Sequence, residues 1–190
     1  SKAPSFDNRL LAWIPYDVDD EIEFINKNGE TLTFEITDKI IKESRFDPAS
    51  GPGENSAMLK ARLKTNSVFK SKEFMYDYLV FISQPLSGKY SGRVTYNLFD
   101  YATVFESYPL SLTKYKQKGQ KKRILDSLAI RNIVLTNVIE LLRDTSTTYL
   151  DNDKCTVYKM YIAEGYGIVG FSDRISNNDW FLKDVARFEN

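Results

Sequence analysis

The sequence predicts an all-β protein in which antiparallel strands form a partly closed barrel or a curled sheet, with room for one short helix. Two observations support this fold class. Apolar and polar residues alternate with a period of two over several stretches, and turn residues separate those stretches. Aromatic residues, which favour strands because flat side chains pack well on a pleated surface, make up 14% of the chain. Consecutive strands joined by short turns are typical of a meander or a barrel.

The size of the chain indicates one domain. It has 190 residues, so we expect a single all-β domain over 1–190, with residues 1–8 as a flexible N-terminal tether because they are polar and contain Pro4. A chain of this length buries enough surface to fold without a disulfide. No apolar run reaches the ~18 residues that a membrane-spanning helix needs.

The first β-hairpin is predicted over residues 21–36, where apolar and polar residues alternate on both sides of an Asn-Gly pair. A two-residue turn would place Ile25 opposite Leu32 and mix the polar and apolar faces. A three-residue loop instead places Phe24 opposite Leu32 and makes one face wholly apolar. We therefore predict the three-residue loop, with Gly29 in the left-handed conformation.

The remaining elements follow in chain order. Residues 47–56 are rich in Pro, Gly and Ser and predict a surface loop. Three aromatic stretches then predict strands, at 74–82, 93–99 and 101–108. Residues 121–143 fit a helix or strands, and we favour strands because 133–139 is rich in β-branched residues and the neighbouring elements are strands. Three final strands are predicted at 155–162, 168–171 and 180–183, with a turn at 177–179.

Residues 165–170 read G-Y-G-I-V-G and match the dinucleotide-binding fingerprint G-x-G-x-x-G. That fingerprint requires a strand before it and a helix after it, because the pyrophosphate lies at the helix N-terminus. The residues after Gly170 predict a strand and a turn instead, and the acid expected further on would be Glu189 at the very end. We therefore predict no cofactor here, and glycines that permit a bend or a close approach of strands.

The composition excludes several classes of catalytic site. Histidine is absent, which excludes Ser-His, Cys-His and His-metal arrangements within this chain. A single cysteine, Cys155, excludes an internal disulfide and a cysteine-rich zinc site, and we expect it to be a small buried side chain. The 26 basic and 26 acidic residues balance, which argues against nucleic-acid binding. No catalytic, cofactor-binding or metal-ligating residue is assigned.

Two kinds of local charge cluster have a functional interpretation and a simpler one. Six cationic side chains lie within 114–123, where they could contact phosphate or an acidic glycan, although a solvated loop or a protected sheet edge is favoured. Carboxylates that could hold calcium gather at Asp17, Asp19, Asp20 and Glu21, and again at Asp151 and Asp153. The EF-hand spacing is absent from both, so acidic turns before strands are favoured.

One resemblance bears on the compartment. The segment V-Y-K-M-Y-I-A-E-G-Y-G-I-V-G-F at 157–171, followed by Trp180, resembles the closing segment of uncharacterised small all-β predicted lipoproteins of Bacteroidetes-type bacteria. The stretch A-W-I-P-Y at 12–16 is similar to their N-terminal opening. The resemblance implies export, a lipid on an N-terminal cysteine that this chain lacks, and a cell-envelope location, outer-membrane-attached or periplasmic.

The expected function is therefore that of an extracytoplasmic, lipid-anchored binding or structural protein. Its ligand would be a hydrophobic molecule, a glycan or another protein, because aromatic side chains can line a pocket, although aromatics at period two more often form a core. The alternative is a carboxylate-dependent hydrolase of the cell envelope. Two or more acids facing each other in a concave pocket, at least one of them with a strongly perturbed pKa, would favour the hydrolase. A deep apolar cavity without acids would favour lipid or small-molecule binding, and a flat exposed aromatic patch would favour a protein or glycan partner.

Overall fold

The computed structural model describes residues 6–44, 53–65, 69, 78–85, 92–99, 101–107, 110–111, 120–143 and 156–184. It contains a short 3-10 helix, η1 (Asn8–Trp13), and strands that are joined by turns and loops. The strands of the N-terminal half are β1 (Glu21–Asn26), β2 (Thr31–Lys42), β3 (Glu54–Thr65), β4 (Val80–Pro85), β5 (Arg93–Leu98), β6 (Tyr101–Ser107) and β7 (Leu110–Ser111). Those of the C-terminal half are β8 (Gln120–Ile130), β9 (Ile133–Arg143), β10 (Val157–Ala163), β11 (Gly167–Asp173) and β12 (Asp179–Leu182).

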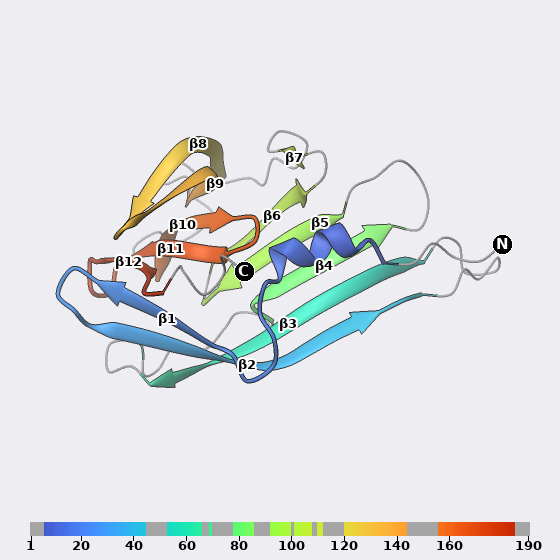
Figure 1. The fold of residues 1–190 in the computed structure, drawn as a ribbon, viewed down its shortest axis with the longest axis horizontal. Coiled ribbons are helices and arrows are strands. Elements are labelled where there is room, and N and C mark those ends of the chain that lie inside the picture. The colour runs from blue at the N-terminus through green and yellow to red at the C-terminus, as the bar shows by residue number, and fades with distance from the viewer. Residues whose placement is uncertain are drawn as a thin grey trace.

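The described strands form one antiparallel sheet that curls into a half-barrel, which confirms the predicted fold class (Figure 1). Their order is β7-β6-β5-β4-β3-β2-β1-β12-β11-β10-β9-β8. The sheet is thus two meanders joined where the first strand pairs with the last, with Phe24 opposite Leu182. Among the described strands, the edges are β7 and β8.

The β1–β2 hairpin has the predicted register. Phe24 lies opposite Leu32 and Ile22 lies opposite Phe34, so one face of the hairpin is apolar. The amide of Gly29 donates to the carbonyl of Asn26 at 3.1 Å, and Gly29 has a φ of +82°. The three-residue loop with a left-handed glycine is therefore confirmed.

The core lies on the inner face of the half-barrel and is strongly aromatic. Phe24 of β1 contacts Phe171 of β11 with ring centroids 5.3 Å apart, which joins the two meanders across their seam. Phe69 stacks on Phe99 at 5.0 Å and meets Trp180 of β12 edge-on at 6.1 Å. Each such pair contributes about 0.5–1.5 kcal/mol beyond its burial. The aromatic rings of these contacts are all buried and form the core.

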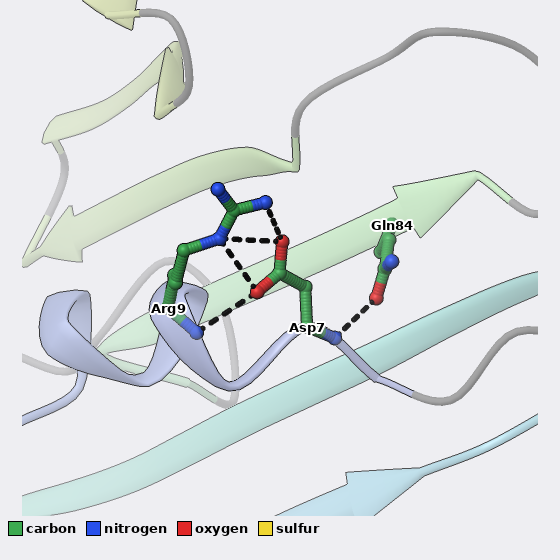
Figure 2. A network of polar contacts seen from close by, with 3 residues as sticks. All are labelled: Asp7, Arg9 and Gln84. Atoms are coloured by element: carbon green, nitrogen blue, oxygen red, sulfur yellow. Dashed lines mark hydrogen bonds and ion pairs between the residues drawn. The ribbon is translucent and has the colours of Figure 1, made fainter.

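Residues 6–16, which we call the strap, cross the inner side of the half-barrel and connect its two flanks. On one flank the backbone amide of Asp7 donates to Gln84 Oε1 at 2.9 Å, while the Asp7 carboxylate caps η1 by accepting from the backbone amide and the guanidinium of Arg9 (Figure 2). On the same flank the Tyr96 hydroxyl donates to the carbonyl of Trp13 at 2.6 Å. The bidentate hydrogen bonding by Arg9 lowers the pKa of Asp7.

The other end of the strap is held by the β10–β11 turn. The backbone amide of Gly165 donates to the carbonyl of Ala12 at 2.8 Å, and the Tyr16 hydroxyl donates to the carbonyl of Tyr166 at 2.6 Å. Residues 1–5 of the expected tether lie outside the described residues, whereas Phe6 is buried and belongs to the core.

The glycine motif forms a β-turn and a strand, as predicted. Gly165 and Gly167 have φ values of +80° and +71°, and they shape the turn between β10 and β11. At Gly170 a Cβ atom would lie 2.6 Å from the Phe181 ring, so only glycine admits β12 this closely. The chain after Gly170 continues as β11 to Asp173 and does not start a helix.

Residues 121–143 are strands, and a phase change explains why their pattern also suits a helix. The pairs Leu125–Val138 and Leu128–Leu135 face inward, so the inward positions are three residues apart on both strands. The register between β8 and β9 is constant, so both strands change phase together around Asn137, which has a φ of +54°. The helix-like spacing therefore comes from a kink in a hairpin.

The β11–β12 turn is organised by a buried carboxylate. Asp173 is completely buried and accepts hydrogen bonds from the Ser176 backbone amide at 2.7 Å, the Ser176 hydroxyl at 2.6 Å and the Trp180 indole N–H at 2.6 Å. Asn177 in this turn is left-handed, with a φ of +53°. The turn predicted at 177–179 is thus present and begins earlier, after Asp173.

Other predicted elements differ in their limits. The described part of the predicted loop at 47–56 includes the start of β3, where Glu54–Thr65 pairs with β2 and β4. That part of the loop prediction was wrong because pairing on both sides overrides its polar composition. Residues 45–52, 74–77 and 108 lie outside the described residues.

Candidate functional site

A pocket opens where β9, the β10–β11 turn and the strap meet. It has a volume of about 390 Å³ and is lined by Trp13, by residues 134–137 of β9, and by Ala163, Glu164 and Tyr166. We call it the β9 pocket. Such a volume admits a small organic molecule.

The pocket exists because β9 separates from β10. Pairing between these strands runs from Leu142 opposite Lys159 to Ile139 opposite Ile162 and then stops. Among the described strands, residues 133–138 pair only with β8. Asn137, with its left-handed φ, lies at the point of departure, and a residue of this conformation redirects an extended strand. The kink thus creates the opening that the turn and the strap line.

The pocket combines an apolar floor with polar groups at its rim. Trp13 and Leu135 are buried, whereas Thr136, Asn137 and Glu164 are exposed. Within the described part of the chain, no residue donates a hydrogen bond to the Glu164 carboxylate or forms an ion pair with it. The side chains of the β9 pocket therefore present a carboxylate, an amide and a hydroxyl to an incoming ligand.

The Glu164 carboxylate also acts on the pKa of a buried tyrosine, Tyr96. Burial raises the pKa of Tyr96 well above its ordinary value, and Tyr16 and Glu164 act in the same direction. The Tyr96 and Tyr16 hydroxyls both donate to backbone carbonyls, at Trp13 and Tyr166. The Tyr96 phenol therefore stays protonated, and the two hydroxyls hold the strap and the turn against the pocket.

Substitution of Asn137 tests the kink. We expect Asn137→Val to destabilise the protein by about 1–2 kcal/mol, because a β-branched residue is strained in the left-handed region. Asn137→Gly should change stability by less than about 0.5 kcal/mol, since glycine adopts this conformation freely. Urea-induced unfolding measures both. The control is Thr136→Val, an exposed neighbour on the same strand, and an equal cost for the two valine variants would contradict the account.

The acidic side chains at 17–21 form ion pairs and hydrogen bonds with other groups of the same chain. Lys39 Nζ lies 2.7 Å from the Asp17 carboxylate and lowers the pKa of Asp17. Asp20 accepts from the backbone amide of Asp17 at 2.8 Å, and Glu21 forms an ion pair with Lys64. Within the described residues, no group of three or more metal-binding side chains is found. The structure thus brings these acids into a turn, while Asp151, Asp153 and Cys155 lie outside the described residues.

The described end of the basic run belongs to a strand. Residues 114–119 lie outside the described residues, whereas Lys121, Lys122 and Arg123 lie on β8. Arg123 donates to Glu140 on the neighbouring strand at 2.6 Å. Burial lowers the pKa of Lys122 to about 8. This part of the run therefore includes one lysine that folding places in an unfavourable environment for its charge.

Stability should consequently depend on pH through Lys122. The pKa falls from 10.5 to about 8 on folding, so the folded state binds the proton less tightly than the unfolded state. The destabilisation is fully present below pH 8 and is relieved as the pH rises toward the unfolded pKa. We expect Lys122→Met to be more stable than the parent by about 1 kcal/mol at pH 7, which is less than the shift would give at about 1.4 kcal/mol for each pKa unit because solvent screens the partly exposed ammonium group.

The measurement is the stability difference between Lys122→Met and the parent at pH 7 and pH 10. The difference should shrink at pH 10, and a difference that is constant or grows would contradict the depressed pKa. Lys121→Met is the control, because Lys121 is an exposed lysine on the same strand.

These features define a class: an antiparallel half-barrel crossed by an N-terminal strap, with a small-molecule-sized pocket at a strand kink. The chain matches no protein-family model, no curated protein and no solved structure at a significant level. Among the described residues, no helix has the length and apolar character needed to cross a membrane.

Sequence reasoning did not find the β9 pocket. Trp13 and Glu164 were noted only within the two segments of a family resemblance, at 12–16 and 157–171. Asn137 lies in the 121–143 stretch, whose pattern fits a helix or strands. The one local feature that could have indicated the kink is an Asn between two β-branched residues. The pocket requires three distant segments to meet, and no local pattern encodes that meeting.

Proposed function

We propose that this protein is a non-catalytic binding protein that takes a small amphipathic ligand in the β9 pocket. The observation that carries the proposal is the coincidence of an apolar floor, a volume of about 390 Å³ and three exposed polar side chains without protein partners among the described residues. Ligand pockets typically pair an apolar lining with a few placed polar groups. The strap and the turn, held by the hydroxyls of Tyr16 and Tyr96, supply a rigid wall.

The pocket favours binding over hydrolysis. Cleavage of a glycosidic bond by carboxylates needs two of them on opposite sides of the bond. The β9 pocket offers one, Glu164. Two buried acids elsewhere are engaged, because Asp173 accepts from Ser176 and Trp180, and Glu140 accepts from Arg123.

A fragment screen followed by amide and indole NMR tests the proposal. We expect bound fragments to shift the signals of Trp13, of residues 134–137 and of residues 163–166. Val134 is 64% exposed at the pocket, so Val134→Arg should block the opening without disturbing the core and should abolish these shifts.

Val18→Arg is the matched control, since Val18 is 48% exposed and does not line the pocket. It should leave binding unchanged. Fragments that still bind to Val134→Arg, or that shift signals only elsewhere, would show that the β9 pocket is not the binding site.

The proposal also places the protein in the cell envelope, anchored by a lipid on an N-terminal cysteine absent from this chain. Its support is the resemblance of residues 157–171 and 12–16 to envelope lipoproteins. Labelling of producing cells with an alkyne-modified palmitate, followed by fractionation, tests it. We expect the native protein to carry the label in the membrane fraction, and an unlabelled protein in the cytosolic fraction would refute the anchor.

A further inference from the structure

The charge of the β9 pocket indicates which ligand class it takes. Glu164 is the one charged side chain in the lining, and within the described residues it has no cationic partner. The pocket lining contains no cationic side chain. Other described acids do form ion pairs, with Arg9, Lys39, Arg62, Lys64, Arg123 and Lys183. An anionic ligand would therefore meet an uncompensated carboxylate.

Two aromatic side chains line the same pocket as that carboxylate. Trp13 and Tyr166 both line the pocket, and Tyr166 is two residues from Glu164 on the same turn. Aromatic rings attract a cation through their negative faces, and the attraction increases where water is partly excluded. A carboxylate with two aromatic neighbours is a chemical environment that selects a positively charged organic group.

The rest of the lining fits the body of such a ligand. Leu135 and Ala163 are buried and form an apolar floor, while Thr136 and Asn137 offer hydrogen-bonding groups at the rim. Val134, Thr136 and Glu164 of the lining are exposed, so a ligand can keep part of its surface in water. These features together describe a compact molecule with one flat apolar part and one cationic end.

We infer that the β9 pocket binds an organic amine, with the ammonium group at Glu164 and the apolar body against Trp13 and Leu135. The inference rests on the proposed binding function and adds the ligand class to it.

Three probes of nearly equal shape test the inference. Tyramine carries an ammonium group, 4-hydroxyphenethyl alcohol is neutral at the same position, and 4-hydroxyphenylacetate is anionic. Binding is followed by NMR through the Trp13 indole N–H. The Trp180 indole N–H serves as an internal reference, because it is buried, donates to Asp173 and does not line the β9 pocket.

We expect tyramine to bind about five to ten times more tightly than the neutral alcohol, the range for one partly exposed ion pair with an aromatic contribution. The anionic probe should not shift the Trp13 signal. Glu164→Gln should reduce the tyramine affinity to that of the alcohol and leave the alcohol unchanged. Glu54→Gln removes an exposed carboxylate outside the pocket and should change neither.

The outcomes separate the two proposals. Equal binding of amine and alcohol, or a Glu164→Gln variant that keeps the preference for tyramine, would overturn the ligand class while leaving the binding function intact. Absence of binding by all three probes would also overturn the ligand class. If, in addition, the fragments of the screen bind only outside the β9 pocket, the proposed binding function is wrong as well.

Discussion

Gly167→Ala is expected to destabilise the protein by about 2–5 kcal/mol. Gly167 has a φ of +71°, and a Cβ atom there would lie 2.5 Å from the Tyr16 hydroxyl oxygen and 2.9 Å from two ring carbons. The left-handed conformation costs a non-glycine residue about 1–2 kcal/mol, and overpacking adds about 1–3 kcal/mol. The Tyr16 ring is completely buried, so it cannot move aside without breaking its hydrogen bond to the carbonyl of Tyr166.

Gly165→Ala provides the control for backbone strain. Gly165 has a φ of +80° on the same turn, but nothing lies within 4 Å of a Cβ atom built there. This variant should cost only about 1–2 kcal/mol. Urea-induced unfolding of both variants isolates the steric contribution as the difference between them, and equal costs would show that Tyr16 does not constrain Gly167.

Asp173→Ala is expected to destabilise the protein by about 3–4 kcal/mol. The substitution removes the acceptor of three hydrogen bonds, two from Ser176 and one from the Trp180 indole. A buried donor left without an acceptor costs about 1–3 kcal/mol. Trp180 is completely buried at the seam between the two meanders, so its displacement should disturb the core beyond the turn itself.

Asp173→Asn separates charge from shape, and Asp179→Asn is the matched control. The amide keeps one acceptor oxygen and should recover part of the stability lost in Asp173→Ala. Asp179 is exposed and accepts from the Ser172 hydroxyl, so Asp179→Asn should cost below about 1 kcal/mol. Stability is measured by urea-induced unfolding, and tryptophan near-ultraviolet circular dichroism reports the indole. Similar losses at both positions would contradict the role assigned to Asp173.

Local sequence patterns were enough to predict the fold class, because the features that decide it are local. Ile22 and Phe24 alternate with acids, and Gly29 supplies the one conformation that aligns their hairpin. The glycines at 165 and 167 were placed in a bend because the residues that follow alternate or turn, as a strand does. Each of these predictions depends on residues that are neighbours in the chain.

The seam and the pocket depend on contacts between residues that are far apart in the sequence, and local patterns do not reveal such contacts. Nothing near Phe24 indicates that its strand pairs with β12, since that pairing joins opposite ends of the sequence. The loop prediction failed at residues 54–56 for the same reason, because pairing with the strands on either side, and not the composition, decides the state of these residues. Likewise Trp13, Asn137 and Glu164 become neighbours only after the sheet has curled.

The strand order has a consequence for the order of folding. Strands β2 to β7 and β8 to β12 each pair with a neighbour in sequence, so each series can assemble from short-range contacts. The β1–β12 ladder, in contrast, cannot form until the last strand has been synthesised. Lys183 and Glu23, for example, contact each other across the seam but lie near opposite ends of the sequence. During translation the edge of β1 that does not pair with β2 therefore has no partner until β12 leaves the ribosome, and pairing of these two strands is the expected slow step. A refolding experiment that follows Trp180 should show it entering its final environment after the bulk of the hydrogen-bonded sheet has formed.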